Sequence, residues 1–204
     1  MSLKKIKIIG IITIFALSFL YHFLYQWFPN PIFSILFPVN ESIWEHMKLL
    51  YTGILSWGLI EIIILKKNKI NYNNYPYQLF LTAFTSIIIY LILYLPIYNL
   101  IGEKIIISIF LLLIVIILEQ MLSYYLLNQK KENDILSKIS IILIIIFYMI
   151  LLNLTYDPPK NYIFYDTVEN KYGINIKWPK VKTNQNILNK TVEDESTSSF
   201  FVNN

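Results

Sequence analysis

Residues Ile105 to Leu127 read IIISIFLLLIVIILEQMLSYYLL, an apolar run with a single charged residue, Glu119. About 20 residues, each rising 1.5 Å along a helix, cross a hydrocarbon core of about 30 Å. Four more apolar runs occur in this 204-residue chain, and we expect all five to span a membrane. The predicted spans are about Ile6 to Phe28, Leu49 to Leu65, Leu79 to Leu100, Ile105 to Leu127 and Ile139 to Leu154.

The composition supports the same class of protein. The chain is 56% apolar, 16% aromatic and only 15% charged, which lies outside the usual range of soluble globular domains. Because lipid offers no water to the backbone, each run must satisfy its own hydrogen bonds as a helix, despite its many β-branched isoleucines. A soluble protein with five buried strands would need polar covering helices, which the sequence lacks. We therefore predict an all-α, polytopic integral membrane bundle of about five transmembrane helices.

The sequence divides into three parts by composition. Residues 1–155 form the predicted transmembrane domain, and residues 156–181 form a membrane-proximal tail in which aromatic side chains alternate with polar ones. Residues 182–204 are polar enough that we expect them to be disordered. Between the first two spans, Pro29 to Val39 is apolar but too short to cross, so we expect an interfacial or re-entrant segment.

Lysine placement predicts the orientation. All 17 basic residues are Lys; nine of them precede the first span or lie in the two polar loops on the same side. The short opposite loops contain only Lys48 and Lys104, and Lys160 and Lys171 in the tail weaken the bias without reversing it. The positive-inside rule then places the N-terminus in the cytoplasm and the C-terminal tail outside the cell membrane. The nine are Lys4, Lys5, Lys7, Lys66, Lys67, Lys69, Lys130, Lys131 and Lys138.

Several other classes are disfavoured. The basic start resembles a signal peptide, but the apolar stretch continues to Phe28, so we predict an uncleaved first span. The net charge of +4 comes from scattered lysine anchors, so we expect no nucleic-acid partner. The absence of cysteine excludes disulfides and thiolate metal sites. Five glycines and no phosphate-loop motif disfavour nucleotide enzymes, and the Ile, Asn, Lys and Tyr content is typical of an AT-rich bacterial genome.

The segment Pro38 to Leu49, PVNESIWEHMKL, is the motif most suited to chemistry. A purely structural interpretation explains much of it. Ser42 and Glu45 fit an S-x-x-E capping box, and Trp44 is placed to anchor at the headgroup level. Direct recognition of a ligand or partner is a further alternative.

A metal or proton site is the sharper hypothesis for the same residues. The chain has only two histidines, His22 and His46, and both are expected in the same outer layer of the membrane. Glu41 and Glu45 lie beside them, and His and Glu side chains bind divalent ions such as zinc or relay protons. His46 lies about 100° around the helix from Glu45, so a straight helix cannot direct all the motif's ligands to one point. A site would therefore use a subset of the four residues.

A second polar layer is expected about 22 Å along the helix from His46. It contains Glu61, for which we expect a structural role with its carboxylate reaching toward Lys66, and Glu119 with Gln120. A buried carboxylate in hydrocarbon costs about 2.5 to 3.5 kcal/mol, so Glu119 should face other helices. Thr82, Thr85 and Ser86 line a side of the third span at a depth suited to hydrogen-bond it.

The motif residues also support a resemblance. The segment P-V-N-E-S-x-W-E-H-x-K-L, with His22-x-x-Tyr25-x-Trp27 before it and Tyr172-Gly173-Ile174 in the tail, resembles an uncharacterised family of small bacterial multi-pass membrane proteins. That family carries a domain-of-unknown-function label. The resemblance supports placement in the membrane and singles out the motif, and it implies no activity.

Three functions remain open at this stage. The leading hypothesis is a small binding or transport component with an ion, proton or small-solute site at the outer mouth. The first alternative is a membrane-embedded metal-dependent hydrolase acting at the outer leaflet, with His22, His46 and one glutamate as ligands and another glutamate as general base. The second is a scaffold for a partner protein. The short length and odd number of spans suit a homo-oligomer or a part of a larger membrane assembly.

Overall fold

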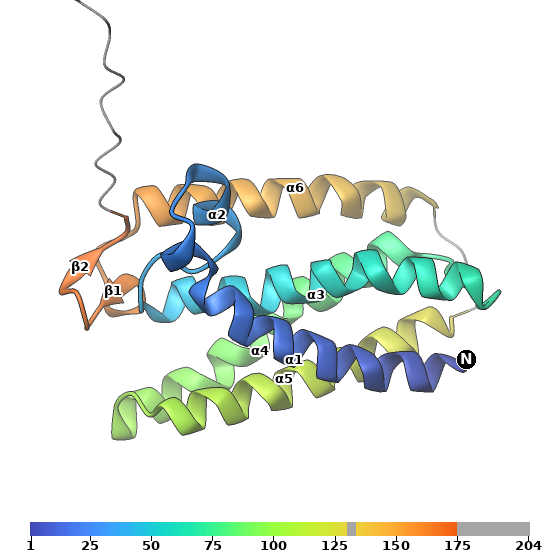
Figure 1. Cartoon of the computed structure of the whole chain (residues 1–204), viewed down its shortest axis with the longest axis horizontal. Helices are drawn as coiled ribbons and strands as arrows, with labels where there is room; N and C mark the ends of the chain where they lie inside the picture. The colour runs from blue at the N-terminus through green and yellow to red at the C-terminus, as the bar shows by residue number, and fades with distance from the viewer. Residues whose placement is uncertain (130–133, 175–204) are drawn as a thin grey trace, which may run out of the picture. The chain divides into compact units, whose positions relative to one another are not determined.

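The computed structural model describes residues 1–129 and 134–174 of the chain. In these residues, five helices are long and apolar enough to cross a membrane (Figure 1). The polytopic all-α prediction is therefore confirmed. The five helices are α1 (Leu3–Trp27), α3 (Ile43–Lys67), α4 (Tyr75–Ile101), α5 (Ile105–Leu127) and α6 (Asp134–Tyr156). The shorter elements are α2 (Pro31–Leu36), the 3-10 turn η1 (Tyr162–Phe164) and a two-stranded antiparallel hairpin of β1 (Tyr165–Asp166) and β2 (Lys171–Tyr172).

Helices α1, α3, α4 and α6 begin before the apolar runs that predicted them, and the last three show why. Helix α3 begins at Ile43 because Ser42 caps it, accepting a hydrogen bond from the Glu45 amide at 3.3 Å. Helix α4 has Pro76 in its first turn, where a missing amide proton costs nothing. Helix α6 begins with Asp134, whose charge complements the positive end of the helix. A cap, a proline or an acidic residue in the first turn thus accompanies each of these starts, whereas hydropathy changes only later in the chain.

Helix α3 is the centre of the bundle. In an apolar 18-residue stretch of α3, 61% of the residues are buried, whereas the corresponding share in α6 is 11%. Helix α3 packs against α1 and α4, α5 packs against the same two helices, and α6 lies along α4. The outward faces carry exposed apolar side chains such as Ile63, Ile106 and Ile145, as expected for contact with lipid.

Close approach of α1 and α3 depends on two glycines. A Cβ atom on Gly53 of α3 would lie 3.3 Å from Ile14 of α1, and one on Gly10 of α1 would lie 2.6 Å from the indole nitrogen of Trp57. Gly53 and Trp57 are four residues apart, on one face of α3, and their partners run in the opposite direction along α1. The two helices are therefore antiparallel and closely packed along this face.

The two ends of the bundle differ in what covers them. The motif end carries α2, the motif and the β1–β2 hairpin, and lies at the left of Figure 1; the N-terminal end carries residue 1 and the α3–α4 loop. Helix α2 packs against α6, where the hydroxyls of Ser34 and Tyr156 are 2.8 Å apart. The expected interfacial or re-entrant segment is thus a short helix packed into the motif end.

The described part of the tail packs on the motif. The Trp44 and Phe164 rings lie 5.2 Å apart, and the Asn40 side-chain amide donates to the Gly173 carbonyl at 3.0 Å. These contacts join the motif to the Tyr172–Gly173 turn 133 residues later in the chain. The expectations for residues 175–181 and for disorder in residues 182–204 lie outside the described residues.

Candidate functional site

His22, Glu41 and His46 meet at the motif end, and we call them the histidine cluster. One ligand atom from each lies within 4.8 Å of the other two. The Glu41 carboxylate is 3.8 Å from His22 Nε2 and 3.4 Å from His46 Nε2, and the two imidazole rings stack with centroids 5.2 Å apart. The expectation that both histidines share one layer is confirmed. Their side chains and that of Glu41 are 26%, 27% and 31% exposed, so solvent reaches the cluster.

The start of α3 explains why Glu41 can join the two histidines. Ser42 is the cap residue, so Glu41 precedes the helix and does not follow its angular periodicity. A helical projection that extends the periodicity of α3 back to Glu41 therefore places this residue wrongly. Freed from the helix, Glu41 turns toward His46, which lies on the face of α3 that meets α1.

Hydrogen bonds orient the cluster. His46 Nδ1 lies 2.8 Å from the Ser42 carbonyl, which can only accept, so Nδ1 carries a proton and Nε2 faces Glu41. Contact with the His46 ring lowers the pKa of Glu41 below its ordinary value, in spite of partial burial. The carboxylate is therefore ionised at neutral pH and available as a ligand.

Asp166 supports the cluster from the tail. This aspartate is fully buried in the hairpin, and its carboxylate accepts a hydrogen bond from the Glu41 amide at 3.2 Å. The other oxygen accepts from the Val168 and Glu169 amides at 2.8 and 3.0 Å. Asp166 was not among the predicted site residues, because nothing in the sequence pattern of the tail indicates that the tail returns to the motif.

Glu45 does not join the histidine cluster. Its carboxylate accepts from the Lys48 ammonium at 2.7 Å and from the Thr155 hydroxyl at 2.9 Å. Lys48 also donates to Thr155 at 2.6 Å and to the Ser34 carbonyl at 2.7 Å, so its three protons all have acceptors. We call Glu45, Lys48, Thr155 and Ser34 the ion-pair cluster. It is fully inside the protein and joins α2, α3 and α6.

The expected capping box is half formed. The Ser42 hydroxyl accepts from the Glu45 amide, as the S-x-x-E pattern predicts. The reciprocal bond is replaced, because the Ser42 amide donates to Asn40 at 2.9 Å while the Glu45 carboxylate accepts from the Val39 amide at 3.1 Å. Glu45 thus has a larger structural role than capping.

At the N-terminal end, Glu61 pairs with Lys7 of α1. The two charged groups are 2.6 Å apart and almost completely buried, and the Tyr75 hydroxyl lies 3.2 Å from the second carboxylate oxygen. The expectation that Glu61 reaches toward Lys66 is wrong. Antiparallel packing brings Lys7 to the level of Glu61, whereas Lys66 lies beside the Tyr72 ring at 5.6 Å. Lys7 also bonds Ser123, which bonds the Gln78 amide oxygen.

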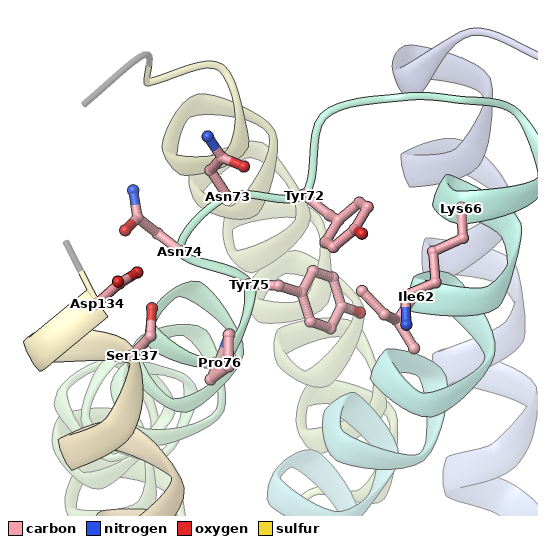
Figure 2. A pocket seen from close by; sticks show the side chains of 9 residues that line it. All are labelled: Ile62, Lys66, Tyr72, Asn73, Asn74, Tyr75, Pro76, Asp134 and Ser137. Carbon is pink, nitrogen blue, oxygen red and sulfur yellow. The ribbon is translucent and has the colours of Figure 1, made fainter. Parts of the chain in front are cut away.

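A hollow of about 330 Å³ lies beside this network, between α3, α4 and α6. Figure 2 shows the Tyr75 ring turned toward α3, with Asn73 and Asn74 on the loop and Asp134 and Ser137 on the opposite wall. Tyr75 thus lines this hollow while its hydroxyl lies 3.2 Å from the buried Glu61. The lining combines amide, hydroxyl and charged groups with no concentration of metal ligands.

The remaining predicted polar residues, Glu119 and Gln120, face different neighbours. Both Glu119 carboxylate oxygens lie 3.0 Å from the Thr85 hydroxyl, as expected from the third span's polar face. Gln120 Oε1 is buried against Gly10 without a hydrogen-bond partner, as is the Trp57 indole nitrogen. Neither Glu119 nor Gln120 approaches the histidine cluster, since both belong to the polar layer nearer the N-terminal end.

The fold and its apolar outer faces define a multi-pass integral membrane protein. The profile of a family of unknown function (DUF6512) matches residues 1–174, and the chain belongs to that family. No curated protein and no solved structure matches the chain. The resemblance to an uncharacterised family is thereby confirmed, whereas the motif as a mark of the family and the bacterial origin stay predictions.

Proposed function

We propose that this protein is a small membrane component that binds a divalent transition metal ion, with zinc as the representative ion, through His22, Glu41 and His46. One observation carries the proposal: three potential ligand atoms from two helices and the intervening loop lie within 4.8 Å of one another. Two imidazoles and one carboxylate form a donor set suited to zinc, and three protein ligands leave a fourth position for water or a solute.

The distances allow the cluster to close on an ion. Ligand atoms around a tetrahedral zinc, each about 2.0 Å from the metal, are about 3.3 Å apart. One Glu41 oxygen is 3.4 Å from His46 Nε2, and the other is 3.8 Å from His22 Nε2. One ligand atom from each residue lies within 4.8 Å of the other two, so rotations of the Glu41 and His22 side chains supply the remaining adjustment. The Ser42 carbonyl already fixes the His46 ring, as outer-shell hydrogen bonds do in metal sites.

Binding or transport is favoured over hydrolysis by the ion-pair cluster. A metal-dependent hydrolase needs a general base near the metal-bound water. Glu45, the second glutamate of the motif, is engaged with Lys48 and Thr155 and lies inside the protein. The carboxylate nearest the histidines is that of Glu41, which would bind the metal itself and so could not act as the base. The cluster is therefore built to hold an ion.

Metal analysis of the purified protein tests this proposal. We expect one zinc per chain after equilibration and gel filtration in detergent, and loss of that zinc in the double variant His22→Ala, His46→Ala. Glu169→Gln is the matched control, because Glu169 is an exposed carboxylate of the same end that bonds Lys171. Zinc retained at full stoichiometry in the double variant, or absent from folded wild-type protein at micromolar zinc, would contradict the proposal.

We further propose that the motif end faces the outside of the cell membrane and the N-terminal end faces the cytoplasm, following the lysine bias. The chain has no native cysteine, so single cysteines report topology directly. An impermeant thiol reagent added to intact cells should label Lys160→Cys, near the hairpin, and spare Asn71→Cys, in the α3–α4 loop; both positions are exposed. The reverse labelling would invert the orientation without affecting the zinc proposal.

A further inference from the structure

Glu119 is a buried carboxyl group with one hydrogen-bond partner among the described residues, Thr85. Glu119 lies on α5 and is 0% exposed. Both of its carboxyl oxygens lie 3.0 Å from the Thr85 hydroxyl of α4. Among the described residues, no lysine or histidine forms an ion pair with it. Thus one hydroxyl is the hydrogen-bonding environment that the structure gives to a carboxyl group deep in the bundle.

The single hydroxyl proton of Thr85 determines which protonation state of Glu119 fits the structure. A threonine hydroxyl has one proton and can also accept. The Thr85 oxygen is 2.7 Å from the Leu81 carbonyl one turn earlier, a shorter distance than to either Glu119 oxygen. A carbonyl can only accept, and Thr hydroxyls on membrane helices commonly bond this preceding carbonyl. The Thr85 proton therefore goes to Leu81, and Glu119 faces a lone pair.

An ionised Glu119 does not fit this arrangement. A carboxylate offers acceptors only, so it would oppose the lone pairs of Thr85 while lying unpaired in a region of low dielectric constant. A protonated carboxyl group instead donates its O–H to Thr85 and needs no counter-ion. From this geometry we infer that Glu119 is a proton-binding site, held as a neutral carboxylic acid by Thr85.

The charged groups of the neighbouring helices leave this inference intact. Helix α5 packs against α4 and α1. The nearest buried cation on these elements is Lys7 of α1, which pairs with Glu61 of α3 at 2.6 Å and so is already neutralised. On α4 the contacting group is Thr85 itself. The site takes a proton rather than a metal ion, because one carboxyl group and one hydroxyl are too few ligands for a divalent cation.

Polar groups lie between the level of Glu119 and the N-terminal end. Ser123, one helical turn away on α5, bonds both Lys7 and Gln78. A hollow of about 360 Å³ between α1 and α5 is lined by Lys7 and Gln120 and reaches the surface beside Lys4. Lys7 lines this hollow and bonds Ser123, so a chain of polar groups leads from the hollow to within one helical turn of Glu119. We therefore expect the proton of Glu119 to exchange, and to do so from the N-terminal end.

Infrared difference spectroscopy of the full-length protein in liposomes tests the inference. Glu119→Gln keeps the shape of the side chain and its bond to Thr85, so we expect it to fold. The wild-type minus Glu119→Gln spectrum at neutral pH should lose a carbonyl band of a protonated carboxylic acid. That band should shift when the water is replaced by D2O. Loss of ionised carboxylate bands instead, or an acid band that does not shift, would overturn the inference.

Two pairs of variants sharpen the test. Glu61→Gln is the control, and its difference spectrum should lose ionised carboxylate bands, because Glu61 pairs with Lys7. If the loss of this pair prevents folding, Glu103→Gln replaces it, because Glu103 is exposed, and the same bands should be lost. For the route, Ser123→Ala should slow the D2O shift at least threefold, whereas Ser108→Ala, on the same helix toward the motif end, should leave its rate unchanged. Slowing by Ser108→Ala alone would place the entry at the opposite end. These outcomes do not depend on zinc binding.

Discussion

The histidine cluster and the ion-pair cluster arise from the same short motif, yet they differ in what they leave unsatisfied. In the ion-pair cluster every proton of Lys48 has an acceptor, the charge of Glu45 is balanced, and water is excluded. In the histidine cluster the two oxygens of one carboxylate lie 3.4 and 3.8 Å from two ring nitrogens, and all three side chains are partly exposed. The comparison separates a complete structural element from an incomplete site that a ligand can complete.

Removing one partner of the ion-pair cluster should have the largest effect. We expect Lys48→Met to lower the free energy of unfolding by about 3 to 5 kcal/mol, because Glu45 is left as a buried, unpaired charge. The measurement is thermal unfolding in detergent at neutral pH. If the pair is structural, the double variant Glu45→Gln, Lys48→Met should recover much of the loss, since it removes both charges. Equal destabilisation by the single and double variants would contradict the balance of charge that defines this cluster.

The Lys7–Glu61 pair should have a smaller effect. Lys7 lines the hollow between α1 and α5, so in Lys7→Met water can enter beside the Glu61 carboxylate, and we expect a loss of about 2 kcal/mol. Lys66→Met is the matched control, because Lys66 lies near Glu61 in sequence and contacts the Tyr72 ring instead. It should change the free energy of unfolding by less than about 1 kcal/mol. A larger loss from Lys66→Met than from Lys7→Met would indicate that Glu61 pairs with Lys66 rather than with Lys7.

The class of fold could be predicted from the sequence because hydrocarbon imposes simple rules. Apolar runs of about 20 residues indicated each membrane helix, and every predicted span lies on an observed helix. The helix starts could not be predicted from hydropathy. Lys48 is a charged residue that hydropathy excludes from a span, yet α3 begins at Ile43 after the Ser42 cap, and pairing with Glu45 balances the charge of Lys48 inside the bundle.

The candidate site was predictable in part for a related reason. The position of His22 near the end of one span and His46 near the start of the next indicated a common layer, and the structure brings the rings into contact. Which glutamate accompanies them depends on whether α3 starts before or after Glu41. The contribution of Asp166 depends on its contact with Glu41, which lies 125 residues away in the chain. Such tertiary contacts have no local signal in the sequence.

The smallest effect should come from Asp166, which acts on the histidine cluster through the Glu41 backbone. Asp166→Asn replaces one acceptor oxygen with an amide donor, and we expect zinc affinity to fall about tenfold, or about 1.4 kcal/mol. Titration with a zinc-competing chelator measures this change. Asp157→Asn, an exposed aspartate of the same tail, should leave the affinity unchanged. Because Asp166 touches no ligand atom of the cluster, a selective loss in Asp166→Asn would show that the tail positions Glu41. Equal affinities in the two variants would show that the tail only covers the motif.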